Sequence, residues 1–406
     1  MMQHTSLIHD WNDDARGAYG ARPITFFDET LRDGLQSPSV AMPSLDARAR
    51  LLRLMAALGI QSANIGFAAA GGAILADILA LGRVIRDERL PVRPTCVGRT
   101  TIGDMEPIIG ASQELGIAIE AACFIGSSEI RRTIEQWDVD DMQRQIEQTV
   151  AFITGHGLEV MFVTEDTTRA RPAVLTRLYR TAIDCGARRI CACDTVGHAT
   201  PRGVRSLIRF LRELAGPEIL IDWHGHNDRG LALINAIVAL EAGADRLEAA
   251  GLGIGERCGN TSMDQLLINL KLMGAIDHDL SRIGEYCQTI SEAVGIPIPV
   301  NYPCVGADAF RTASGVHAAA IVKAQELGDT WLANRVYSGV PAEEFGREQQ
   351  IEIGPMSGRS NVVHWLRARG LEVDDAVIAR VLERAKVARG LLSEDELREL
   401  SGAPGA

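Results

Sequence analysis

Short apolar runs alternate with longer runs of helical periodicity from about residue 22 to about residue 275. The short runs are rich in β-branched and aliphatic residues, as is typical of buried strands. Several of the longer runs end at a glycine, which accepts the left-handed backbone that closes a helix. The pattern predicts strands over residues 23–28, 62–66, 92–97, 118–125, 158–164, 188–194, 218–224 and 246–251. The clearest predicted helices are Leu45–Leu58, Met142–Thr154, Ala173–Cys185 and Leu231–Ala242.

Eight strand–helix units in roughly 250 residues predict a (β/α)8 TIM barrel. An open doubly wound sheet is the alternative, but eight parallel units without a long insertion favour closure. After residue 276 the pattern changes to a short helical stretch, a proline-containing connector, a mixed region and terminal helices. We therefore expect an N-terminal extension over 1–21, a catalytic barrel over 22–276 and a smaller, mostly helical C-terminal domain over 277–406.

The chain has 406 residues and a formal net charge of -12, which argues against nucleic acid as the main partner. Its apolar runs are too short for a membrane span, and its polar start lacks the apolar core of a signal peptide. These features predict a cytoplasmic protein without a membrane partner. Among the eight cysteines, Cys191 and Cys193 would share one face of a strand. Small core residues are the favoured interpretation, since no second cysteine pair completes a zinc site.

Polar residues collect where the predicted strands end, which is where TIM barrels place their active sites. His224 and His226 stand two residues apart at a strand end, so both imidazoles would point to one face as a pair of metal ligands. A merely polar strand end is the alternative for that pair. The other polar residues at strand ends are Asp33, Arg131, Glu165, Asp166, Asp194, Thr195 and the segment 251–260.

Several motifs, in order, resemble the DRE-TIM metallolyase superfamily and, within it, the homocitrate and isopropylmalate synthases. The resemblance covers roughly residues 22–370, and its motifs lie at residues 28–36, 165–169, 194–201, 224–230, 253–261 and 314–317. The first reads Asp-Glu-Thr-Leu-Arg-Asp-Gly-Leu-Gln, and the fourth reads His-Gly-His-Asn-Asp-Arg-Gly.

The resemblance implies a divalent metal, Mg, Mn or Zn, held by Asp33, His224 and His226, with Asn260 as a further ligand or support. Such an ion would bind the carbonyl and carboxylate of a 2-oxo acid and act as a Lewis acid. Arg32 would stabilise the same developing oxyanion, the alternative being a plain salt bridge.

The resemblance also implies acetyl-CoA as co-substrate, because the family removes a proton from its methyl group. His317, from the second domain, matches the base, and Glu165 and Tyr337 match residues that orient or tune it. Gln36 and Thr195 are expected to bind substrate. The family arrangement implies a homodimer in which the second domain serves the partner subunit's barrel.

Substrate choice depends on Arg131, which matches the arginine that binds the far carboxylate of 2-oxoglutarate in the homocitrate-synthase type. The sequence thus predicts an acyltransferase that condenses acetyl-CoA with an anionic 2-oxo acid, giving a homocitrate- or 2-substituted-malate-type product and CoA. A phosphono- or phosphinopyruvate also fits an arginine fork.

Three other functions stay open. The first is a 2-isopropylmalate or citramalate synthase for a neutral oxo acid, with Arg131 a solvated residue. The second is a carbon–carbon lyase like hydroxymethylglutaryl-CoA lyase, which has a comparable cysteine loop at Cys258. The third is a non-catalytic metal-binding protein, which the intact set of site residues disfavours.

Overall fold

The computed structural model describes residues 7–12 and 23–403, so most of the predicted N-terminal extension lies outside the described residues. The chain forms two compact units. The first contains the described residues up to Asp279 together with Glu285–Pro297. The second contains Leu280–Gly284 and the described residues from Ile298 onward.

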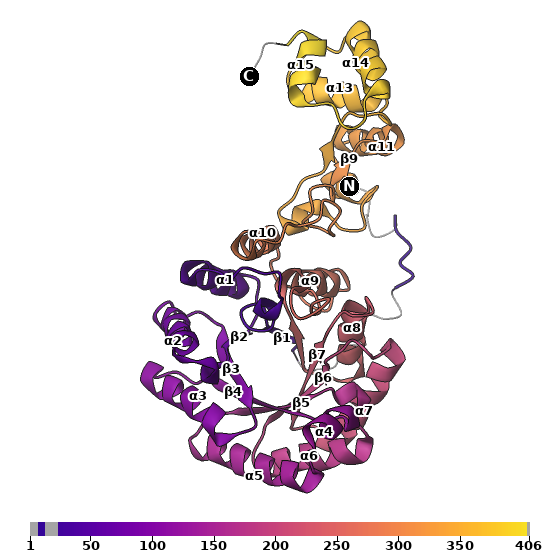
Figure 1. The fold of residues 1–406 in the computed structure, drawn as a ribbon. Coiled ribbons are helices and arrows are strands. Elements are labelled where there is room, and N and C mark those ends of the chain that lie inside the picture. Colours follow the sequence, from indigo (N-terminus) through magenta and orange to yellow (C-terminus); the bar gives the residue numbers. More distant parts are fainter. Residues whose placement is uncertain (1–6, 13–22, 404–406) are drawn as a thin grey trace. The chain divides into compact units, whose positions relative to one another are not determined.

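Eight parallel strands of the first unit close into a barrel in chain order, with β8 paired to β1 (Figure 1). This confirms the predicted TIM barrel, and the open-sheet alternative is wrong. The strands are β1 (Thr25–Asp28), β2 (Ser62–Gly66), β3 (Arg93–Arg99), β4 (Glu120–Gly126), β5 (Val160–Glu165), β6 (Arg189–Asp194), β7 (Leu220–Gly225) and β8 (Arg246–Ala249).

Helices surround the barrel, and most of them carry an apolar face that packs on the strands. Their ends follow local rules: the Ser44 hydroxyl accepts from the Ala47 amide at the start of α1, and Gly243, with φ of 113°, ends α8. The helices are α1 (Leu45–Ala57), α2 (Gly72–Asp87), α3 (Ile102–Leu115), α4 (Glu129–Glu135), α5 (Val139–Gly155), α6 (Pro172–Asp184), α7 (Pro201–Ala215), α8 (Ala232–Ala242), α9 (Met263–Leu272) and α10 (Ile283–Val294).

The barrel interior has an apolar layer and a charged layer. Cys191 and Cys193 lie in the apolar layer, fully or almost fully buried, with sulfur atoms 3.8 Å apart. This agrees with their prediction as core residues. Arg246, near the amino ends of the strands, donates to Asp222 at 2.6 Å and to Glu120 at 2.7 Å. These pairs compensate the charges that the barrel buries near the amino ends of its strands.

The second unit consists of short helices and one small sheet. Its terminal part has its own core, which includes Val362, Trp365, Ile378 and Val381. No described helix is long and apolar enough to cross a membrane. The elements are β9 (Arg311–Thr312), α11 (Gly315–Glu326), α12 (Thr330–Arg335), β10 (Gln350–Ile351), α13 (Arg359–Ala368), α14 (Asp375–Val387) and α15 (Glu394–Ser401).

Candidate metal-dependent active site

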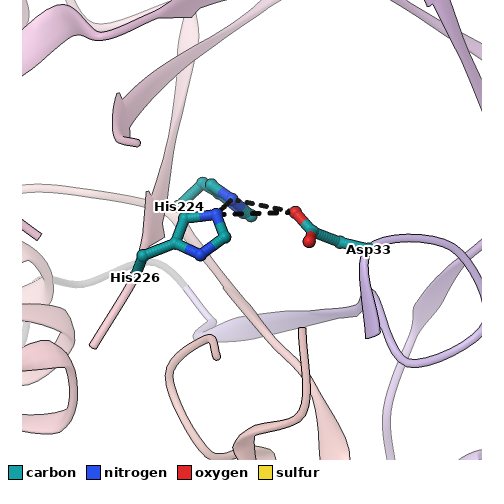
Figure 2. A group of neighbouring side chains, drawn as sticks. All are labelled: Asp33, His224 and His226. Carbon is teal, nitrogen blue, oxygen red and sulfur yellow. Dashed lines mark hydrogen bonds and ion pairs between the residues drawn. The ribbon is translucent and has the colours of Figure 1, made fainter. Parts of the chain in front are cut away.

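Asp33, His224 and His226 converge at the carboxyl end of the barrel and point toward one another (Figure 2). Asp33 Oδ2 lies 3.4 Å from His224 Nε2 and 3.6 Å from His226 Nε2. The two Nε2 atoms are 3.2 Å apart. All three side chains are buried, and their ligand atoms lie within 4.8 Å of one another.

The strands place these ligands. His224 belongs to β7 and His226 follows it, so the two-residue period turns both rings inward. Asp33 follows β1, the first strand of the closed sheet. A side chain at Gly255 would meet Asn260 Nδ2 at 2.2 Å, so only glycine lets this loop approach the site so closely.

Asn260 lies beside the same cluster. It forms an isolated antiparallel bridge with His226, and its Nδ2 donates to the Ile254 carbonyl at 3.0 Å. That bond fixes the amide, while Oδ1 is buried and has no hydrogen-bond partner among the described residues. An amide oxygen held in this way is a ready ligand or support for a cation.

Arg32 lies next to the cluster. Its guanidinium pairs with Glu29, a carboxylate that sequence analysis did not single out. Its Nη2 is 2.7 Å from Glu29 Oε2, and its Nη1 is 3.5 Å from Asp33 Oδ2. Asn64, on β2, donates to the same Glu29 carboxylate at 3.1 Å. The salt bridge that was the alternative for Arg32 therefore exists, and it holds the guanidinium next to the candidate metal ligands.

Burial and neighbouring charges shift the pKa values of the three candidate ligands. Burial alone would raise the pKa of Asp33, but Arg32 and the two histidines hold it well below its usual range. Burial would lower the pKa of His224, yet its hydrogen bonds to Asp33 and Glu248 raise it above the ordinary value. Burial, and then the charge of His224, lower the pKa of His226 to about 4. His226 is therefore neutral at pH 7 and offers a lone pair.

The residues present fit a divalent cation. Asp33 Oδ1, His226 Nδ1 and Asn260 Oδ1 are buried atoms without hydrogen-bond partners among the described residues. Unsatisfied buried polar atoms are costly, and a cation would compensate the oxygens. Glu29 and Asp33 flank the guanidinium of Arg32, and Glu248 faces His224, so three carboxylates gather around the cluster. Mixed imidazole and carboxylate donors suit Zn, Mn or Mg.

Arg131 lies at the start of α4, next to the end of β5. Its Nη1 is 3.0 Å from Glu135 Oε1, and its Nε is 3.5 Å from Glu165 Oε1. Its guanidinium lies 5.8 Å from the Trp137 ring. Burial raises the pKa of Glu165, and Arg131 partly offsets this. Arg131 is about one-third exposed, at 33%, and its charge is already opposed by two carboxylates.

The other predicted substrate residues, Gln36 and Thr195, differ in exposure and in hydrogen bonding. Gln36 is exposed and accepts a long hydrogen bond of 3.5 Å from Arg32. Thr195 is half-buried, and its hydroxyl accepts from the Asp166 amide at 2.8 Å. The Thr195 hydroxyl hydrogen can still be donated to a ligand.

His317 and Tyr337 belong to the second unit. His317 lies in the first turn of α11, and Tyr337 follows α12. Their rings stack with centroids 3.9 Å apart and an interplanar angle of 24°. Both side chains are exposed, so the stacked pair is accessible from outside the second unit.

Sequence analysis missed the carboxylates that support the site. Glu248 Oε2 lies 3.2 Å from His224 Nδ1, and Glu29 lies against Arg32. The one available signal was a charged residue inside an apolar strand, as in Arg246-Leu247-Glu248-Ala249. That signal does not tell which residue the carboxylate contacts.

The HMGL-like family model matches residues 23–290, which contain the whole barrel and every predicted metal ligand. The chain belongs to the HMGL-like family. Among curated members, homocitrate synthase AksA of Methanopyrus kandleri is 32% identical over 366 residues, covering 89% of this chain and 87% of the relative.

Other HMGL-like relatives carry different names. A probable 2-isopropylmalate synthase of Ignicoccus hospitalis is 30% identical over 385 residues, covering 93% of this chain and 92% of the relative. The HMG-CoA lyase of Bacillus subtilis matches in structure with a TM-score of 0.58 and 21% identity, covering 69% of this chain and 96% of the lyase. The lyase match shows a common fold alone. The curated matches support the synthase branch but differ in the oxo acid that their names imply.

Proposed function

We propose that this protein is an acyltransferase that condenses acetyl-CoA with a 2-oxo acid and releases CoA. The cluster of Asp33, His224 and His226 beside Arg32 carries the proposal, because it joins a cation site to a fixed guanidinium. The homocitrate and isopropylmalate synthases at about 30% identity support the same reaction type.

Asp33, His224 and His226 would hold the cation, with Asn260 as a further ligand or support. When bound, it would polarise the carbonyl of the oxo acid as a Lewis acid. The chain's own residues provide the other groups that the reaction needs. Arg32 is placed to donate to an oxygen that gains negative charge beside Asp33. Glu29, which accepts from Asn64, fixes the orientation of the guanidinium.

His317 is assigned the proton abstraction from the acetyl-CoA methyl group. The carbanion equivalent then attacks C2 of the oxo acid. The carbonyl oxygen takes up one proton, which balances the proton removed from the methyl group, and becomes a hydroxyl, and water cleaves the thioester to release CoA. Tyr337 stacks on His317 and would orient its ring. Glu165 is assigned to the same proton-transfer system. The proposed assembly is a homodimer in which the second unit of one subunit serves the partner's barrel.

An anionic oxo acid, such as 2-oxoglutarate or phosphonopyruvate, is the proposed substrate class. The guanidinium of Arg131 would bind its distal acid group, because an arginine fork suits a carboxylate or phosphonate. Glu135 is exposed enough, at 38%, for an incoming acid to displace it. One observation favours a neutral oxo acid instead, since Arg131 is already paired with Glu135 and needs no further anion.

The test is CoA release, read with a thiol reagent, from acetyl-CoA and a panel of oxo acids. The panel contains 2-oxoglutarate, oxaloacetate, phosphonopyruvate, pyruvate and 2-oxoisovalerate. We expect turnover that a chelator abolishes and Zn²⁺, Mn²⁺ or Mg²⁺ restores. Turnover with 2-oxoisovalerate or pyruvate alone would select the neutral-substrate synthase. Absence of turnover with every acid would reject the condensation.

A further inference from the structure

We infer that Glu248 is the positioning residue that presents His224 to the metal. This inference rests on the proposed function and adds a residue outside the set of ligands and catalytic groups. The two nitrogens of the His224 ring face different carboxylates. Nδ1 faces Glu248 Oε2 at 3.2 Å, and Nε2 faces Asp33 Oδ2 at 3.4 Å.

A ring nitrogen can either donate a proton or offer a lone pair. A carboxylate next to Nδ1 accepts a hydrogen bond, so Glu248 holds a proton on Nδ1. Nε2 is then the nitrogen that would offer its lone pair once a cation replaces the proton shared with Asp33. Carboxylate partners of this kind fix the orientation of metal-bound histidines and make them more basic.

The barrel enforces this contact. His224 on β7 and Glu248 on β8 are direct register partners, so their side chains stand next to each other on the inner face. Glu248 is only 3% exposed. A buried carboxylate is costly without a partner, and the His224 ring provides a charged or hydrogen-bonding one.

If Glu248 had only a structural role, it would belong to the network of buried ion pairs in the barrel. Arg246, two residues earlier on β8, is committed to Asp222 at 2.6 Å and to Glu120 at 2.7 Å. The ion pair of Glu248 is with His224. The second histidine has no equivalent support, since His226 Nδ1 has no hydrogen-bond partner among the described residues. Glu248 therefore acts on one ligand only.

The test measures metal affinity with the metal alone, by competition of Zn²⁺ and of Mn²⁺ against a chromophoric chelator. Glu248→Ala removes the acceptor and should weaken metal binding about 10- to 100-fold. Glu248→Gln keeps a hydrogen-bond acceptor without the charge and should lose less. Cys193→Ala is the control, because it opens a packing defect at the register neighbour of His224 and leaves Glu248 in place.

Thermal unfolding of the metal-free variants separates positioning from structure. We expect metal affinity to fall more in Glu248→Ala than in Cys193→Ala at similar metal-free stability. Unchanged affinity in folded Glu248→Gln and Glu248→Ala would overturn the inference, as would equal losses in Cys193→Ala. If Glu248→Ala does not fold, unchanged metal affinity in Glu248→Gln is enough to overturn the inference. A wild-type protein that binds metal but condenses no oxo acid would instead reject the proposed function.

Discussion

The ring of His317 stacks on the ring of Tyr337, with centroids 3.9 Å apart. The contact is between α11 and the loop after α12, so Tyr337 limits the orientations of the proposed base. We expect His317→Ala to slow exchange of the acetyl-CoA methyl protons into D₂O by about two to four orders of magnitude. Oxo-acid affinity should change little, because the metal ligands belong to the barrel.

Variants of Tyr337 separate the ring from the hydroxyl. Tyr337→Phe keeps the stacked ring and should retain most exchange if orientation is what matters, whereas Tyr337→Ala should lose it. His364→Ala, in α13, is the control histidine of the same unit. Proton exchange that survives in His317→Ala at the wild-type rate would contradict the assignment of the base.

Removal of Asp33 tests the metal site. Asp33→Asn keeps the volume of the side chain but removes the charge that His224 and His226 face, so bound metal and turnover should both be lost. Metal analysis after dialysis measures the first and CoA release the second. Full turnover of the wild-type protein after exhaustive chelation, with no metal detected, would contradict a metal-dependent reaction.

Arg131→Ala tests the substrate class. If its guanidinium binds the distal acid, the variant should lose about two to three orders of magnitude in kcat/KM on an anionic oxo acid, from roughly 3 to 4 kcal/mol at about 1.4 kcal/mol per decade. Neutral oxo acids should lose little. Arg132→Ala is the control on the same helix, where Arg132 pairs with Glu129 at 3.3 Å. An unchanged substrate ranking would favour the neutral-substrate synthase.

Mixed dimers test whether subunits share the site. His317→Ala and Asp33→Ala subunits should each be inactive, but in the proposed arrangement a mixed dimer has one complete site. Random exchange should then restore about a quarter of the sites. Subunit exchange is verified with two differently tagged chains. Mixed dimers without activity, despite demonstrated exchange, would show that each subunit supplies its own base.

Asp28 gives a pH-dependent prediction for stability. Burial, partly offset by hydrogen bonds from Thr30 and Tyr286, raises its pKa from 3.8 to about 6. Between these values the folded state holds a proton that the unfolded state has released, so stability falls as pH rises. At about 1.4 kcal/mol per pKa unit this amounts to at most about 3 kcal/mol.

The Asp28→Asn variant should show a smaller fall than the wild type, because only the contribution of Asp28 is removed. Urea unfolding at pH 4 and pH 6, followed by circular dichroism, measures the slope, and Asp184→Asn is an exposed control. Equal slopes in wild type and Asp28→Asn would show that the Asp28 carboxyl titrates in its ordinary range.

The sequence by itself determined the barrel and its candidate chemistry. Strand and helix periods depend on local geometry, so alternating runs were enough to predict eight strands that the structure contains. Active sites of such barrels lie at the strand ends, and this rule predicts Asp33, His224 and His226 as site residues. The motifs then indicated the synthase branch.

Only the tertiary structure decided which partners surround these residues. Glu248 supports His224 because β7 and β8 pair in one particular register, which no local pattern encodes. Glu29 holds Arg32 and accepts from Asn64 because β1 and β2 lie side by side. Tyr286, in α10, donates to the buried Asp28 at the end of β1. Contacts of this kind join residues far apart in the chain, and they depend on how strands and helices close around a common core rather than on the residues adjacent in sequence.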